Sequence, residues 1–170
     1  QSQPAMTTAA DPPERLELAA GTTVVVFTRA GDRWDHELRL ADGRAWRSVE
    51  GPTSEVGDPR WPASPPLVEV SLAATSDGTA ILGVGRAGRS HYSLCVTQCL
   101  DLADTLHFDV ACRIQEPAGW LGSTYRPTGE IVPSSLPTDL PATVRWSYTV
   151  GPEGIRGRAA AGSVAVRRRR

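Results

Sequence analysis

The chain contains no lysine, only three cysteines and no long apolar run. No segment approaches the ~20 consecutive apolar residues of a membrane-spanning helix, so no membrane span is predicted. All 18 basic residues are arginine, and they are spread along the chain among 19 acidic residues. We interpret this bias as compositional. The alternative is recognition of phosphate or carboxylate groups, because the guanidinium group presents a planar fork of donors.

The last four residues, Arg167 to Arg170, form a basic tail. Without them, 14 arginines stand against 19 acidic residues, a net charge of −5. Nucleic-acid-binding domains usually carry a basic body, so no nucleic-acid partner is expected. Residues 1–14 are polar and without periodicity, which predicts a flexible lead-in. Residues 15–166 are expected to form a single β domain, a size that can bury a substantial core.

Three cysteines are an odd number, which argues against a disulfide framework. In an extended strand, Cys95 and Cys99 would point to the same side ~13 Å apart, too far to pair unless the chain bends between them. Cys112 is in phase with an apolar strand face and is predicted to be a small core residue. Reduced thiols favour a cytoplasmic location. A secreted protein whose leader has been removed is the alternative.

The chain does contain alternating apolar and polar residues, the period of a β-strand. Its 14 prolines and 16 glycines also suit short strands joined by turns. We predict an all-β fold of about nine to eleven strands, arranged as an antiparallel β-sandwich or a closed or partly open β-barrel. Outside the central region, the predicted strands are 22–30, 33–40, 44–49, 143–150, 155–159 and 163–166.

Two long loops rich in proline and glycine interrupt the strands, at residues 51–66 and 116–140. The first contains five prolines and Trp61, and the second has room for one short strand. Loops of this length either cover a site or are ordered by their own packing. We interpret Trp61 as a packing anchor for its loop, and the alternative is that it caps a ligand.

The clearest pattern lies between Leu67 and Ile114, where four alternating runs predict a β-meander. One face of this meander is apolar and is expected to join the core. The residues predicted on that face are Val68, Val70, Leu72, Ala74, Ala80, Leu82, Val84, Tyr92, Leu94, Val96, Leu106, Phe108, Val110, Cys112 and Ile114. The opposite, polar face is the first place to look for a site. Its predicted members are Glu69, Ser71, Gly83, Gly85, His91, Ser93, His107, Asp109 and Arg113.

Residues 83–88 match the G-x-G-x-x-G string of dinucleotide-binding proteins. That function requires the string to leave a parallel strand and open a helix, whereas here it enters another predicted strand. Nucleotide binding is therefore rejected. Gly83 and Gly85 instead predict a bare patch of sheet, since glycine inside a strand often marks the close approach of another group.

Matching the apolar faces of the last two runs leaves two antiparallel registers. One places His91 opposite Arg113, and the other places Ser93 opposite Asp109. In either register the charged residues of the polar face cluster together.

Two kinds of catalytic site can be drawn on this face. Ser93, Asp109 and one histidine could form a hydrolase triad, although a serine in mid-strand lacks the sharp turn and oxyanion hole of such enzymes. His91, His107 and Asp109 could bind zinc, although the histidines lack the paired spacing of metal sites. His36, the third histidine, is in phase with apolar neighbours and is predicted to lie at the core edge, bonded to the backbone.

The sequence therefore predicts a non-catalytic domain that binds a small polar ligand or a protein. No catalytic residue, metal site or cofactor is predicted. One alternative is a small hydrolase or metal-dependent enzyme, and another is a purely structural domain of a larger assembly. The candidate ligand-binding residues are His91, Ser93, His107, Asp109, Arg113 and Trp61.

Overall fold

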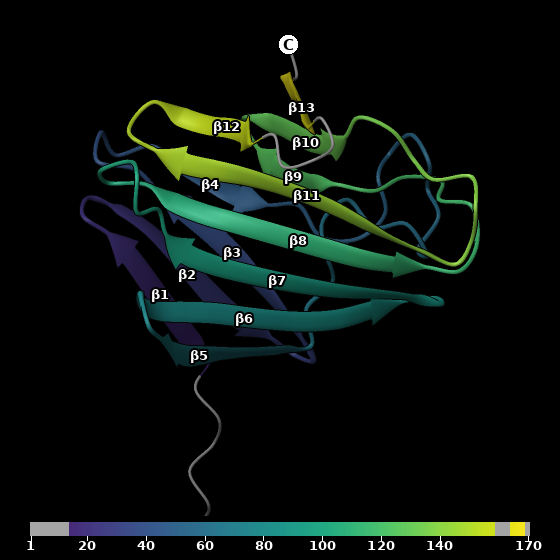
Figure 1. Ribbon diagram of the computed structural model, residues 1–170, viewed down its shortest axis with the longest axis horizontal. Helices are drawn as coiled ribbons and strands as arrows, with labels where there is room; N and C mark the ends of the chain where they lie inside the picture. Colours follow the sequence, from purple (N-terminus) through teal and green to yellow (C-terminus); the bar gives the residue numbers. More distant parts are fainter. Residues whose placement is uncertain (1–13, 159–163, 169–170) are drawn as a thin grey trace, which may run out of the picture.

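The computed structural model describes residues 14–158 and 164–168, which form a sandwich of two antiparallel β-sheets (Figure 1). Of the predicted lead-in at residues 1–14 only Glu14 is described, and of the predicted basic tail at 167–170 residues 169–170 lie outside the described residues, whereas Arg167 and Arg168 belong to strand β13. The described residues form thirteen strands. These are β1 (Arg15–Ala20), β2 (Thr23–Ala30), β3 (Arg33–Arg39), β4 (Ala45–Ser48), β5 (Glu69–Thr75), β6 (Gly78–Ala87), β7 (Ser90–Gln98), β8 (Leu106–Ile114), β9 (Ser123–Arg126), β10 (Gly129–Pro133), β11 (Ala142–Gly151), β12 (Gly154–Arg158) and β13 (Val164–Arg168).

One sheet has seven strands in the order β1-β2-β3-β4-β9-β10-β13, and the other has six in the order β12-β11-β8-β7-β6-β5. In Figure 1 the six-stranded sheet lies in front, rising from β5 to β12, and β1 to β4 lie behind it. The described residues contain no helix, and hence none that is long and apolar enough to cross a membrane. The all-β prediction is confirmed, and the strands form a two-sheet sandwich and not a closed barrel.

The described chain has more strands than the nine to eleven predicted, for two reasons. Strand β1 was not predicted, although Leu16, Leu18 and Ala20 alternate in it. The second long loop contains a hairpin, β9 and β10, in place of a single short strand. Both strands of this hairpin join the seven-stranded sheet, where β9 pairs with β4.

The core lies between the two sheets, and β8 shows why its sequence forms a strand there. Alternate side chains from Leu106 to Ile114 are buried against the other sheet, among them Cys112. The intervening side chains, such as Asp109 and Arg113, point away from the core and are exposed. This period-two burial is the pattern that the sequence predicted for β8, including the core position of Cys112.

Strand β6 faces the opposite way from the prediction. Leu82 and Val84, predicted to face the core, are 42% and 45% exposed, whereas Ile81 is fully buried. Because β6 is apolar on both sides, its alternation could not decide which side is buried. Gly83 and Gly85 therefore lie on the inner face and not on the polar face.

The inner position of these glycines lets the first long loop cross the sheet. A Cβ atom on Gly83 would lie 3.0 Å from the Leu67 side chain, and one on Gly85 would lie 1.7 Å from the Pro66 carbonyl oxygen. The close approach predicted from the glycines is therefore real, but it occurs inside the sandwich. Trp61 of the same loop is only 2% exposed and packs beside Gly119, so it is a packing anchor and not part of the outer face.

A chain of polar groups crosses the core. The Nε2 atom of His36 lies 2.7 Å from the Tyr125 hydroxyl, which lies 2.6 Å from the Tyr148 hydroxyl. The His36 ring is buried and stacks on Phe27. The predicted backbone partner for this ring is wrong, because Tyr125 of β9, two strands away in the seven-stranded sheet, supplies the hydrogen bond.

Candidate functional site

The outer face of the six-stranded sheet is the polar side of the predicted meander. In Figure 1 no other drawn element crosses this face. The side chains of His91, Ser93, Arg113 and Arg145 are exposed on it. Among the described residues, the face is therefore accessible to a ligand.

The pairing of β7 with β8 follows the first of the two predicted registers. His91 lies opposite Arg113, and Cys95 lies opposite Asp109. The predicted alternative, with Ser93 opposite Asp109, is wrong, and Ser93 instead faces Ala111. Both registers place apolar side chains opposite one another in the core, so the apolar pattern alone did not decide between them.

Two adjacent rows of side chains cross this face at one end. The first row runs through Arg86, His91, Arg113 and Thr143, which lie opposite one another on β6, β7, β8 and β11. Neighbouring strands are ~4.8 Å apart, so the row extends ~14 Å. It brings two arginines and a histidine into one line.

The second row contains smaller side chains in its middle. It runs through Val84, Ser93, Ala111 and Arg145 on the same four strands. The short side chains of Ser93 and Ala111 leave a depression between the valine and the arginine. We call this depression, with the first row along its side, the outer-face groove.

The outer-face groove has a volume of about 420 Å³. Its walls include His91, Arg113, Thr143 and Arg145, and its floor includes Ala111. Small-molecule sites in proteins are commonly ~300–1,000 Å³. The groove is therefore large enough for a small ligand, although it is open along its outer side.

The arginines of the two rows differ from six other arginines of the described residues. Six arginines form ion pairs with Asp or Glu: Arg15, Arg39, Arg44, Arg47, Arg60 and Arg156. Within the described part of the chain, Arg86, Arg113 and Arg145 form no ion pair. Arg113 Nη1 donates only a 3.3 Å hydrogen bond to Thr143 Oγ1. The groove is consequently bordered by positive charge that no described carboxylate neutralises.

His107 and Asp109 lie at the other end of β8. Their closest approach, from Nε2 to Oδ1, is 3.6 Å, which is longer than a hydrogen bond. His107 is six residues from Arg113, the partner of His91, so the two histidines are ~20 Å apart along the sheet. His91, His107 and Asp109 therefore do not share one site.

A metal centre also lacks a suitable set of ligands. Among the described residues, no group of three or more His, Cys, Asp or Glu side chains is close enough to hold a metal ion. Cys95, Cys99 and Cys112 form no disulfide bond with one another. Burial raises the pKa of the Cys112 thiol to about 11, which keeps it protonated and unreactive.

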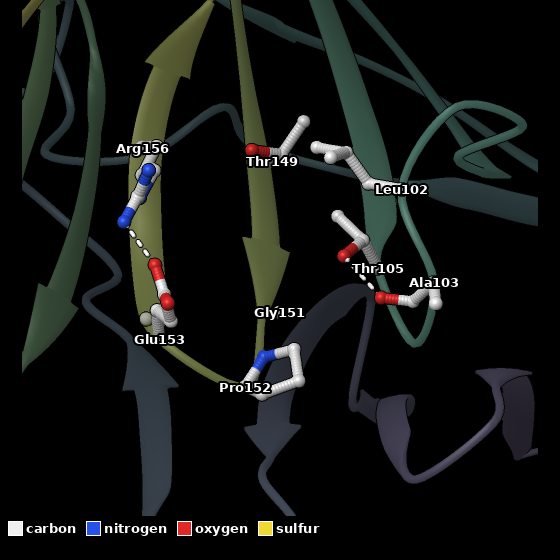
Figure 2. A pocket seen from close by; sticks show the side chains of 9 residues that line it. Leu102, Ala103, Thr105, Thr149, Gly151, Pro152, Glu153 and Arg156 are labelled. Carbon is white, nitrogen blue, oxygen red and sulfur yellow. Dashed lines mark hydrogen bonds and ion pairs between the residues drawn. The ribbon is translucent and has the colours of Figure 1, made fainter.

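A second hollow, of about 300 Å³, lies at one end of the sandwich beside the β11–β12 turn (Figure 2). Its charged residues, Arg156 and Glu153, form an ion pair with each other. The Thr105 hydroxyl donates a 2.8 Å hydrogen bond to the Ala103 carbonyl oxygen. Because these polar groups already have partners, this hollow offers less to a polar ligand than the outer-face groove does.

Sequence reasoning named three residues of the groove, His91, Ser93 and Arg113, and missed Arg145 and Thr143. The missed residues lie on β11, which pairs with β8 although a long segment separates the two strands. Comparison with protein-family models, curated proteins and solved structures found no match to this chain.

Proposed function

We propose that this protein is a non-catalytic binding domain that takes a small anionic ligand in the outer-face groove. The observation that supports this most is the position of Arg113 and Arg145 in the walls of one groove, with Arg86 in the same row as Arg113, all without a described carboxylate partner. A guanidinium group donates in a planar fork that fits the oxygens of a carboxylate or phosphate. Hydrogen bonds between a guanidinium group and a carboxylate or phosphate are among the stronger ones in proteins.

The other groups of the groove suit a compact ligand. Ser93 and Thr143 carry hydroxyl groups that can donate to or accept from a polar ligand. Val84 forms one apolar wall at the opposite side from Arg145. We therefore expect a ligand with an anionic group toward the arginines and a short apolar or hydroxylated part toward β6.

Binding is favoured over catalysis by the surroundings of Ser93. Its neighbours directly across the sheet are Val84 and Ala111, and neither can accept its proton. A serine nucleophile requires a base within hydrogen-bond reach and donors for the developing oxyanion. Among the described residues, Ser93 forms no hydrogen bond with His91, two residues away on β7, or with Asp109, and His107 lies ~13 Å farther along β8, so none of them is placed as that base.

Titration with inorganic phosphate and with citrate tests the proposal. We expect saturable shifts of the amide NMR signals of Ser93, Ala111 and Arg145. Arg113→Gln and Arg145→Gln should each weaken binding about tenfold, since a charge-assisted hydrogen bond contributes roughly 1.5–3 kcal/mol. Arg29→Gln, which alters an exposed arginine of the other sheet, is the matched control and should bind as the wild type does.

The same titration separates this proposal from the purely structural alternative. If neither anion shifts the groove signals, or if both groove variants bind as tightly as Arg29→Gln, the groove is not an anion site. A domain that only packs in a larger assembly would give that result.

A further inference from the structure

The two sheets end in four edge strands, and β5 is the least protected of them. The edge strands are β1, β13, β12 and β5. Native proteins usually guard such edges with charged residues, because the unpaired backbone groups can pair with another chain. Each of the first three contains two or more charged residues, whereas β5 contains only Glu69. At seven residues, β5 is also the longest of the four.

The side chains of β5 are sorted by face. Toward the core side lie Val70, Leu72 and Ala74, and Leu72 is 50% exposed because no strand lies beyond β5. Toward the outer side, Ser71 and Ala73 are small and leave room for a neighbouring strand. The open edge therefore combines free backbone groups with an apolar side chain that is only half covered.

We propose that a second copy of this chain pairs with β5 in antiparallel fashion, about a two-fold axis through Leu72. Leu72 is the middle residue of Glu69–Thr75, so this register pairs all seven residues. Glu69, the sole charge, then faces Thr75 of the second copy and not another Glu69. Like charges directly opposite in a sheet are destabilising, and this register avoids them.

The same register matches the apolar side chains. Leu72 faces Leu72 of the second copy, and Val70 faces Ala74. These pairs lie on the core side, so they continue the apolar layer from one sandwich into the next. Isologous contacts of this kind, in which a surface binds its own copy, are the usual basis of two-fold dimers.

Leu67, two residues before the start of β5, limits the extent of the pairing. Its carbonyl oxygen accepts a 2.9 Å hydrogen bond from the Trp34 amide of β3, so the chain is already paired at that point. The free edge therefore begins with β5 itself. Because core sides pair with core sides, the axis is perpendicular to the sheet, and both copies present their outer-face grooves on the same side.

Sedimentation analysis of the full chain over roughly 1 µM to 1 mM tests this dimer. We expect a concentration-dependent dimer for the wild type. Leu72→Lys would place two ammonium groups opposite each other at the axis and should weaken dimerisation at least tenfold. Leu100→Lys changes a leucine that is 74% exposed on the β7–β8 loop, and it should dimerise as the wild type does.

A wild type that remains monomeric up to the highest concentration overturns the proposal. So does a dimer that persists unchanged in Leu72→Lys, because association would then use another surface. Neither result depends on whether the outer-face groove binds an anion, so the two proposals fail separately.

Disulfide trapping tests the register even if the lysine variant folds poorly. In a background with Cys95→Ser and Cys99→Ser, Leu72→Cys should cross-link two copies under mild oxidation, since opposite Cβ atoms in a sheet are ~4.5–5.5 Å apart. Ala74→Cys is the matched control, because its copy would lie ~13 Å away in this register. We expect at least tenfold faster cross-linking at position 72, and equal rates would contradict the register.

Discussion

The backbone of Gly85 lies directly under the carbonyl group of Pro66, where a Cβ atom would be 1.7 Å from the oxygen. Gly85→Ala should therefore force the loop away from the sheet and lower the free energy of unfolding by about 3 kcal/mol. Equilibrium unfolding in urea measures the change. Thermal unfolding should shift in the same direction.

Gly83→Ala, on the same strand, should be less destabilising than Gly85→Ala. Its Cβ would meet the Leu67 side chain at 3.0 Å, and a side chain can move more cheaply than a backbone carbonyl. We expect a loss of about 1 kcal/mol or less. Equal losses for the two variants would mean that the loop does not constrain the sheet through the Pro66 carbonyl.

The hydroxyl of Tyr125 joins His36 to Tyr148 in the core. Tyr125→Phe should lower the free energy of unfolding by about 1–3 kcal/mol, because it leaves the buried His36 ring without a partner and removes one of the partners of Tyr148, which also bonds Ser123. Tyr148→Phe should cost less, since it leaves the His36 contact intact. A smaller effect for Tyr125→Phe than for Tyr148→Phe in denaturant unfolding would contradict this arrangement.

The sequence was most informative where one face of a strand is strongly apolar. In β7 and β8 the large apolar residues alternate with polar ones, so the buried face could be predicted and the register was limited to two alternatives, of which the structure has one. In β6, Ile81 and Leu82 are adjacent and both apolar, so the alternation fits either face. The deciding contact, Pro66 against Gly85, joins residues whose proximity the sequence pattern does not express.

The candidate site could be predicted only in part for a similar reason. His91, Ser93 and Arg113 are on strands joined by a short connection, so their clustering follows from local pairing. Arg145 reaches the groove because β11 pairs with β8 across a long intervening segment. The sequence identified β11 as a strand but gave no sign of which strand lies beside it, since strand order is set by packing of the whole domain.

Burial lowers the pKa of His36 to about 3, well below its usual value of 6.5. Because the unfolded chain binds this proton more readily, His36 makes the folded state less stable as the pH falls from 6.5 toward 3. The free energy of unfolding falls by at most about 1.4 kcal/mol for each unit by which the pH falls. His36→Gln should remove this dependence. The stability difference between wild type and His36→Gln, measured in urea at pH 5 and at pH 7, should change by about 2 kcal/mol between the two pH values.

Glu50 acts in the opposite direction over part of this range. Desolvation raises the pKa of its carboxyl to about 7 from 4.5, so the folded state loses stability as the pH rises between these values. The Glu50 residue is exposed overall, so solvent screening makes its contribution the smaller of the two. Glu50→Gln should therefore steepen the loss of stability on acidification, whereas an unchanged profile would show that this carboxyl titrates normally.

Ala111 forms the floor of the outer-face groove between Ser93 and Arg145. Ala111→Phe should fill the depression without altering any charge, and should weaken phosphate and citrate binding at least tenfold if the ligand enters the groove. Ala45→Phe, at an exposed strand position of the other sheet, is the matched control. Calorimetric titration at low salt measures both variants, because added salt screens an exposed arginine site. If Ala111→Phe binds as Ala45→Phe does while the arginine variants do not, the anion rests on the rim of the groove and not within it.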